Sequence, residues 1–350
     1  MTVSAEAVIW GYRFFLGRDP ESPDVVEVHR DSKDALHLAQ KLVASAEFRA
    51  KQSSLLVPGT SVAPQFCEQL IETKATEEQI AGCLAKIKAA WSHLGTVAPH
   101  FSVLTSDRYR PANIAQSIET FWRSGDAEAE QFLRTLARYG LAAPASGTCV
   151  EFGCGVGRVT MGLARHFAHV DAYDISAAHL ELARGRAREV DADNITFHEC
   201  SANLLGALAP CDAFYSRLVF QHNPPPVIVR LICNALRALR PGGIAVFQIP
   251  AHITGYSFEL RKWLQTEHAL DMHMHCIPQR DVFESIASMG CELLEVREDN
   301  SAGAPDRIVS NVFVVRRVRR GTRSTAPAGQ RQAPSRKAVR RRARAGHRPQ

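Results

Sequence analysis

The spacing of apolar residues along this chain changes near Gly147. Before that point, apolar side chains recur every three to four residues, the period of an amphipathic helix. Residues 11–30 offer an apolar stripe followed by a helix start at Asp19 and Pro20, and helices are predicted over residues 34–50, 76–94, 112–125 and 127–140. The last two end at Gly125 and Gly140, and glycine is the residue best suited to a helix C-cap.

After Gly147, short runs of β-branched and aromatic residues alternate with amphipathic helices. Strands are predicted at residues 148–153, 169–176, 195–200, 212–220, 243–250, 291–299 and 307–315, with helices at 159–167, 177–190 and 227–239. Strands alternating with helices at this spacing predict a parallel sheet covered by helices on both faces. We therefore divide the chain into a helical N-terminal domain (1–95), a helical lead-in covering the ligand site (96–146), an α/β domain (147–317) and a tail (318–350).

Composition and cysteine usage narrow the class of protein. The 350 residues are 45% apolar, enough for an ordinary globular core. No apolar run approaches the roughly 20 residues that span a bilayer, and the N-terminus lacks the pattern of a signal peptide. The nine cysteines are scattered, with no CxxC pair, which argues against disulfides and thiolate zinc sites. We expect a cytoplasmic protein.

The charge is unevenly distributed. From Arg316 onward the chain holds 13 of its 42 Lys and Arg residues and no Asp or Glu, so the preceding part carries 29 basic against 36 acidic residues. The tail has too little apolar content to bury a core and is expected to be disordered. It has no aromatic residue to stack on a base, so we expect no specific nucleic-acid partner and at most weak contact with an anionic surface.

Three glycines at alternate positions follow the first predicted strand, in VEFGCGVGR. Gly153, Gly155 and Gly157 lie where open α/β sheets bind nucleotides, and a side chain there would keep a ligand away from the backbone. Asp174 stands at the end of the second strand, where a carboxylate can accept hydrogen bonds from both ribose hydroxyls. These features predict a nucleoside-containing ligand.

Two classes of ligand fit such a loop. Dinucleotides use GxGxxG, but this spacing is GxGxG, and Arg158 occupies the place of the third glycine. Glu151, at the end of the first strand, would repel a pyrophosphate and suits a cationic or amino-bearing ligand. S-adenosylmethionine (SAM) has a ribose, a sulfonium and an α-amino group, and no phosphate.

Residues 147–250 resemble a class I SAM-dependent methyltransferase through VEFGCGVGR, VDAYDIS and LRPGGIAVF. The resemblance implies SAM as cofactor and a Rossmann-like sheet of order 3-2-1-4-5-7-6 with an antiparallel last strand. The segment ECSANLL lacks the carboxylate that relatives often place after strand three to receive the adenine amino group. Residues expected at the cofactor are Glu151, Gly153, Cys154, Gly155, Gly157, Asp174, Ile175, Ser201, Ala202, Asn203 and Ser216.

Methyl transfer needs alignment of acceptor and methyl, and sometimes removal of a proton. His222 is the candidate general base because its pKa lies near working pH, and the alternative is that it only packs over the cofactor. The insertion 251–277 is a candidate acceptor-binding lid. Weaker acceptor contacts are expected at Arg217, Gln221, His252, Tyr256, His273 and His275. A metal site at His268, His273 and His275 is the less favoured alternative, and no metal is predicted.

The segment Asn223–Pro226 resembles the NPPY-type motif of nucleic-acid amino-methyltransferases. That motif should follow strand four directly and end in an aromatic residue that stacks on a flipped base. Here it lies downstream and ends in proline. We interpret it as a helix N-cap at Asn223 followed by prolines in the first turn.

The N-terminal segment WGYRFFLGRDP, with SAEFR some 30 residues later, resembles a small helical domain of unknown activity in bacterial proteins associated with surface glycans. This resemblance favours O-methylation of a sugar, a glycan or another small molecule. The alternatives are N- or C-methylation, or a catalytically silent scaffold that recruits partners. The sequence does not predict the oligomeric state.

Overall fold

The computed structural model describes residues 3–48, 69–141, 147–200, 208–267, 270–299, 301–303 and 307–319. The predicted adenine contacts Ser201, Ala202 and Asn203 lie outside these residues, as do His268 and most of the basic tail. In the part of the chain that the structure describes, no helix is long and apolar enough to cross a membrane.

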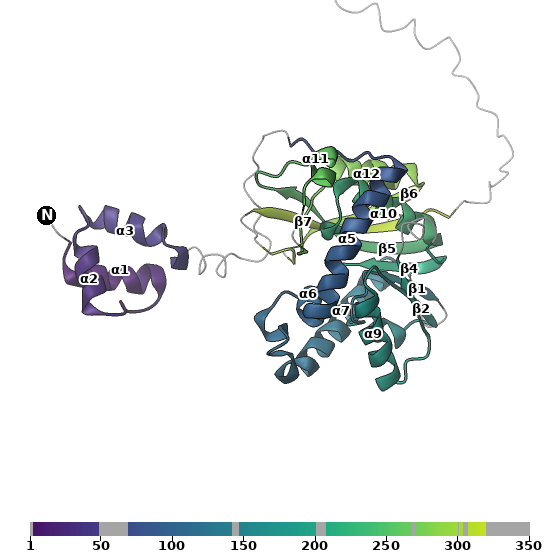
Figure 1. Cartoon of the computed structure of the whole chain (residues 1–350), viewed down its shortest axis with the longest axis horizontal. Coiled ribbons are helices and arrows are strands. Elements are labelled where there is room, and N and C mark those ends of the chain that lie inside the picture. Colours follow the sequence, from purple (N-terminus) through teal and green to yellow (C-terminus); the bar gives the residue numbers. More distant parts are fainter. Residues whose placement is uncertain are drawn as a thin grey trace, which may run out of the picture. The chain divides into compact units, whose positions relative to one another are not determined.

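A seven-stranded sheet forms the centre of the fold (Figure 1). Its order is β3-β2-β1-β4-β5-β7-β6. β7 runs antiparallel to both β5 and β6, while the remaining neighbours are parallel. The order and the antiparallel last strand predicted from sequence are confirmed. The strands are β1 Thr148–Phe152, β2 His169–Asp174, β3 Ile195–Glu199, β4 Cys211–Ser216, β5 Leu239–Ile253, β6 Cys291–Glu298 and β7 Ile308–Arg317.

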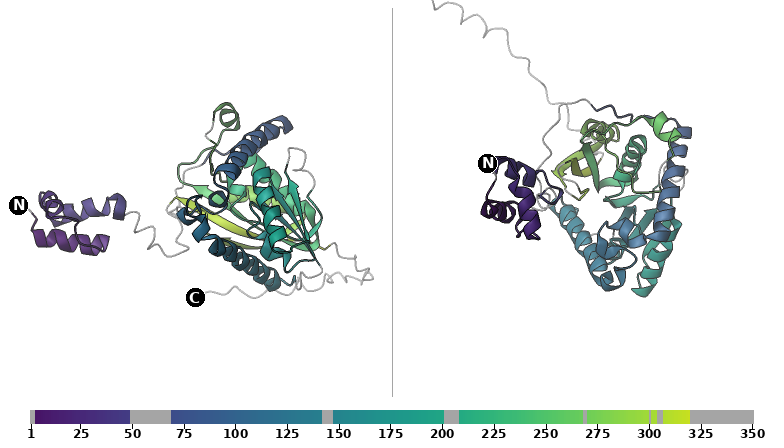
Figure 2. Two further views of the ribbon diagram at one scale, coloured as in Figure 1. Left: turned by 60° about the horizontal axis from the view of Figure 1, so that its bottom comes forward. Right: turned by 60° about the vertical axis from the view of Figure 1, so that its left-hand side comes forward.

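Helices cover both faces of the sheet (Figure 2). On one face, α7 and α8 bury Phe132, Leu136 and Leu163 against β1, β4, β5 and β7. On the other, α5, α10 and α12 share a larger apolar core with the same strands. The helices are α5 Glu77–Val97, α6 Pro99–Val103, α7 Ile118–Arg138, α8 Thr160–Ala164, α9 Ala177–Glu189, α10 Pro225–Ala238, α11 Leu260–Gln265 and α12 Gln279–Ser288, with short η2 Asp107–Tyr109, η3 Ile114–Gln116 and η6 Phe220–His222.

Helix α7 corrects the prediction of a helix end at Gly125. It continues unbroken through that residue to Arg138, and only Gly140, with φ 75°, behaves as a helix-terminating glycine. A Cβ on Gly125 would lie 1.9 Å from the carbonyl oxygen of Arg158. Glycine is therefore required here for close approach of α7 to the glycine loop, because the missing Cβ lets the two backbones meet.

The prolines of α10 lie in its first turn as predicted, but Asn223 is not the N-cap. The cap position is Pro224, and the Asn223 side-chain amide donates to the carbonyl of Val219 at 2.9 Å. Asn223 thus braces the loop after β4 rather than the start of the helix.

The helices α1 Ala5–Gly11, η1 Tyr12–Leu16, α2 Pro23–Arg30 and α3 Ala35–Val43 enclose an apolar cluster of their own. Its buried members are Val3, Val8, Tyr12, Leu16, Leu38 and Leu42. Helix α2 begins at Pro23 with Ser22 as N-cap, not at Asp19 and Pro20. The Asp19 carboxylate instead accepts a hydrogen bond from Arg13 at 2.6 Å.

Helix α5 belongs to the core of the α/β fold through Ile80, Leu84 and Ile87. The chain just before it is tied to the predicted lid. Ile71 and Phe258 form a parallel bridge, in which the Phe258 amide donates to Leu70 at 2.8 Å and the Glu72 amide donates to Phe258 at 3.1 Å. The domain boundary at residue 95 stays a prediction.

Candidate functional site

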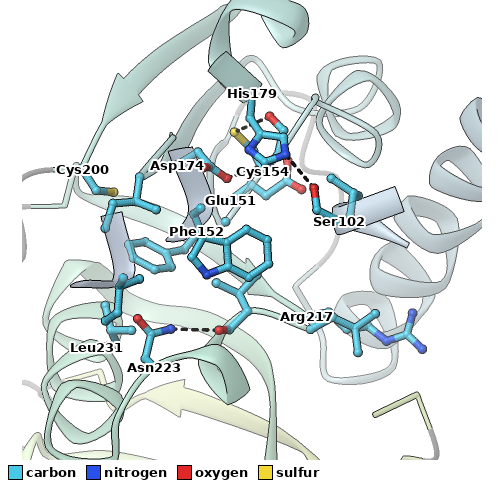
Figure 3. Close-up of a pocket in the computed structure, with 18 of the residues that line it drawn as sticks. Ser102, Glu151, Phe152, Cys154, Asp174, His179, Cys200, Arg217, Asn223 and Leu231 are labelled. Atoms are coloured by element: carbon cyan, nitrogen blue, oxygen red, sulfur yellow. Dashed lines mark hydrogen bonds between the residues drawn. The ribbon is translucent and has the colours of Figure 1, made fainter. Parts of the chain in front are cut away.

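A cavity of about 280 Å³ opens at the carboxyl ends of β1, β2 and β4. We call it the first cavity. Figure 3 shows Asp174, Glu151 and His179 on one side of it and Asn223 and Leu231 on the other. These three strands are parallel, and α/β sheets bind ligands at the carboxyl ends of their parallel strands. Helix α5 closes it from outside with Ala81, Leu84, Ala85, Ile87, Lys88 and Trp91.

The glycine loop forms the floor of the first cavity. Gly153, Gly155 and Gly157 all have positive φ, at 79°, 55° and 84°. A Cβ on Gly153 would lie 2.2 Å from a methyl of Val219, so the loop after β4 can approach only because that atom is missing. Gly153 and Gly155 line the cavity, and Gly157 faces Met161 and Ala183 behind it.

Asp174 ends β2 with its carboxylate in the cavity wall and only 8% exposed. One oxygen accepts from the Gly155 amide at 2.8 Å and the other from the Ser176 amide at 2.9 Å. These bonds fix the carboxylate against the glycine loop. Since each carboxylate oxygen accepts more than one hydrogen bond, the group can still receive the two hydroxyls of a ribose.

Glu151 is a buried carboxyl group at the end of β1. It accepts a hydrogen bond from the Thr160 hydroxyl at 2.6 Å, and no ion pair of the described residues includes it. Burial raises its pKa to about 8, an effect that the Thr160 hydrogen bond and the charge of Arg158 only partly offset. A buried carboxyl without a cation favours a ligand that brings a positive charge.

The raised pKa predicts a pH-dependent stability difference between the wild type and Glu151→Gln. The folded wild type holds a proton on Glu151 that the unfolded chain loses above its ordinary pKa of 4.5. Its contribution to stability is therefore lost progressively as pH rises from that value to about 8. Glutamine carries no such proton. As pH rises through this range, the free energy of unfolding of the variant, measured by thermal melts, should therefore increase relative to that of the wild type by up to about 1.4 kcal/mol per pH unit. If the melting temperatures of the two proteins changed with pH in the same way, the raised pKa of Glu151 would be contradicted.

The comparisons with known proteins agree with this geometry. Residues 149–243 match the family described as "Methyltransferase domain". With the sheet order above, the fold is that of the class I SAM-dependent methyltransferases.

Similar solved structures include magnesium protoporphyrin IX methyltransferase from Synechocystis PCC 6803 with bound SAM, at 18% identity and TM-score 0.44, covering 66% of this chain and 97% of that one. Geranyl diphosphate methyltransferase in complex with SAM is 19% identical with a TM-score of 0.44, and the match covers 62% of this chain and 94% of that one. The N-methyltransferase NodS from Bradyrhizobium japonicum WM9, in complex with S-adenosylhomocysteine, is 18% identical with a TM-score of 0.39. This match covers 54% of this chain and 86% of that one. No curated protein matches the chain.

A charged network borders the first cavity on the α7 side. Glu128 accepts from Arg158 at 2.6 Å, from Arg217 at 2.9 Å and, through its other oxygen, from the Tyr215 hydroxyl at 2.6 Å. Burial alone would raise the pKa of Glu128, but the charges of the two arginines and the Tyr215 hydrogen bond outweigh it and lower the pKa. Glu128 is thus a buried carboxylate ion, held by the two cations beside it.

Several residues of the site were not found from sequence. Glu128, Arg158, Tyr215, His179 and Ser102 all line the first cavity. His179 stands in the first turn of α9, five residues after Asp174, so its position next to the ribose acid was a usable signal. The remaining four come from segments whose meeting depends on tertiary packing.

His179 has a defined tautomer in this arrangement. The Ser102 hydroxyl donates to the Pro99 carbonyl at 3.0 Å, so it accepts from Nε2 of His179 at 2.9 Å. Burial lowers the pKa of His179, and the ring is neutral, with Nδ1 as an acceptor that has no partner among the described residues. This acceptor lies beside Gly95 of α5, where an added Cβ would stand 2.8 Å from it.

The predicted residues after β4 divide into two groups. Arg217 lines the first cavity, whereas Ser216 is turned inward and donates to the Phe152 carbonyl at 2.9 Å. Gln221 and His222 lie outside the lining. Nδ1 of His222 bonds the His273 carbonyl at 2.9 Å, and burial lowers the pKa of His222 to about 4. His222 is therefore neutral at physiological pH, which a general base requires, but the low pKa weakens it as a base.

Two of the predicted lid residues, Tyr256 and His275, belong to an aromatic cluster outside the lining of the first cavity. The Tyr256 hydroxyl and Nδ1 of His275 are 2.8 Å apart, and Phe258 and Trp263 pack on the same imidazole. His252 pairs with Val309 within the sheet. Across the described residues, no group of three His, Cys, Asp or Glu side chains is placed to hold a metal ion.

Proposed function

We propose that this protein is a SAM-dependent methyltransferase that methylates an oxygen of a sugar or another small-molecule acceptor. The observation that carries the proposal is the first cavity, in which Glu151, Asp174 and the glycine loop line one enclosed space. The match of residues 149–243 to a methyltransferase domain supports the same proposal.

The residues present fit SAM better than a phosphate-bearing cofactor. Of the cavity-lining cations, Lys88 is paired with Glu199 at 2.6 Å, and Arg158 and Arg217 both with Glu128. A pyrophosphate would have to break these pairs. The uncompensated carboxyl of Glu151 suits an amino group, and the Asp174 carboxylate suits a ribose.

Arg158 and His179 offer two further points of attachment. Nε of Arg158 and Nδ1 of His179 are buried and have no partner among the described residues. The Arg158 donor would be satisfied by the carboxylate of a methionine moiety, and the His179 acceptor by a hydroxyl or amino group. When bound, SAM supplies a methyl group already activated by its sulfonium. The chain's own residues bind and orient it, and the cover of α5 keeps water out.

Calorimetric titration with S-adenosylhomocysteine tests this proposal. We expect micromolar binding to the wild type and about 100-fold weaker binding to Asp174→Ala, because the variant loses hydrogen bonds to a charged acceptor. Asp193→Ala, at an exposed aspartate just before β3, is the matched control and should bind as the wild type does.

Folding of each variant is checked by circular dichroism, because Asp174 also braces Gly155 and Ser176. A folded wild type that does not bind S-adenosylhomocysteine would refute the proposal and favour a catalytically silent scaffold.

A further inference from the structure

A second cavity of about 330 Å³ lies between α7 and the sheet. Its walls come from α7, from β4, β5 and β7, and from the residues at and after the end of β6. No sequence pattern pointed to it. The lining residues are Glu128, Gln131, Phe132, Thr135, Tyr215, Arg217, Val246, Arg297, Glu298, Asp299, Ser301 and Val312.

The two cavities share a wall one side chain thick. Glu128, Tyr215 and Arg217 line both of them. In Figure 3 the guanidinium of Arg217 points away from Asp174 and Glu151, and its partners Asp299 and Ser301 belong to the second cavity. A molecule in the second cavity would therefore be separated from one in the first only by this wall.

The lining of the second cavity combines apolar and polar side chains. Phe132, Tyr215 and Val246 provide an apolar and aromatic surface, while Gln131 and Ser301 provide polar groups. Aromatic surface beside convergent polar groups suits a ring that is apolar on its faces and hydroxylated at its edge. The volume, at the lower end of the range for ligand pockets, has room for one such ring.

Charge in the second cavity comes from the carboxylates of Glu128, Glu298 and Asp299 and from the guanidinium groups of Arg217 and Arg297, and both arginines form ion pairs. Arg217 contacts Glu128 at 2.9 Å and Asp299 at 3.5 Å, and it donates to Ser301. Arg297 pairs with Glu295 at 3.6 Å. An anionic or cationic ligand would compete with these pairs, so the lining favours a neutral one.

We propose that the second cavity binds the methyl acceptor, and that the bound group is a neutral, hydroxylated ring of the size of one sugar. The proposal rests on the proposed function. It places the acceptor on the α7 face of the sheet, not under the lid, whose described residues line neither cavity. Arg217 is the positioning residue, because its side chain lines both cavities where they meet.

The reaction balances with these components. The acceptor oxygen forms a bond to the methyl carbon as the carbon–sulfur bond breaks. The sulfur keeps the bonding electron pair and becomes a neutral thioether. The hydroxyl proton leaves to solvent through the polar side of the second cavity.

The test uses the full chain saturated with S-adenosylhomocysteine, and a panel of methyl glycosides of common hexoses as probes. Binding is measured by saturation-transfer NMR and titration. Gln131→Trp places a large ring at the second cavity from the exposed surface of α7. The matched control is Glu130→Trp, at the neighbouring exposed residue of the same helix, which lines neither cavity.

We expect at least one glycoside to bind, Gln131→Trp to weaken it at least tenfold, and Glu130→Trp to leave it unchanged. S-adenosylhomocysteine affinity should stay within about twofold in both variants. No glycoside binding, or equal binding to Gln131→Trp, would overturn the acceptor site while leaving the cofactor site intact. Loss of S-adenosylhomocysteine binding in the wild type would instead refute the proposed function, and the acceptor assignment with it.

Discussion

Gly125→Ala is expected to destabilise the protein by about 3 kcal/mol or more, at the upper end of the cost of overpacking. The added methyl would stand 1.9 Å from the Arg158 carbonyl oxygen and 2.6 Å from its carbonyl carbon. Both are backbone atoms, so no rotamer change can relieve the contact. Helix α7 must move away from the glycine loop, and we expect the melting temperature to fall by roughly 6–12 °C.

Gly185→Ala is the matched control for this effect. Gly185 also lies inside a helix, α9, but a Cβ there meets nothing closer than Arg188 at 4.0 Å. Alanine should stabilise that helix by about 0.5–1 kcal/mol. Thermal and urea unfolding of the two variants would separate the contact from the general effect of Gly-to-Ala replacement. Equal melting temperatures would disprove the close approach of α7 to the loop.

Glu128→Ala is expected to cost about 3–5 kcal/mol of folding free energy, because it leaves the charges of Arg158 and Arg217 without their common partner. The Arg158 side chain is only 5% exposed, so water cannot replace the carboxylate. Glu128→Gln should cost less, since it keeps the shape and one acceptor for Tyr215 or an arginine. Urea unfolding at neutral pH measures both.

The control for Glu128 lies on the same helix. Glu130 pairs with Arg134 at 3.5 Å, and both side chains are more than half exposed. Exposed pairs of this kind contribute little, so Glu130→Ala should change stability by less than about 0.5 kcal/mol. If Glu128→Ala were no more costly than Glu130→Ala, the buried network would not be a stabilising element of the fold.

Local features of the chain were predictable because their signal lies within a few residues. The glycine loop and Asp174 each follow a strand, and parallel strands bring their carboxyl ends to one edge of the sheet. Glu151 could be placed in the same way, from its position in the first strand. The sheet order followed from the family resemblance, and the structure confirms it.

Gly125 shows where such reasoning fails. A C-cap glycine and a close-approach glycine both depend on a missing Cβ, so sequence cannot tell them apart. The deciding fact is a contact with Arg158, 33 positions away.

The second cavity and the charged network could not be predicted from the sequence for a related reason. Glu128 meets Arg217 across 89 positions and Arg158 across 30. No periodicity or motif marks these residues, because each lies in an element that is predictable by itself and their meeting is set by helix packing. Arg158 was noticed only as a departure from the dinucleotide pattern, and its role became clear once α7 was in place.

The bridge between Ile71 and Phe258 has a consequence for the rate of ligand exchange. Helix α5 covers the first cavity and begins five residues after Glu72, which is bonded to Phe258 and, through its carboxylate, to the Leu260 amide at 2.6 Å. An outward movement of the start of α5 must break these hydrogen bonds or carry the Phe258 segment with it. A ligand that entered or left past the start of α5 would therefore also displace the insertion, although none of the insertion's described residues lines the cavity.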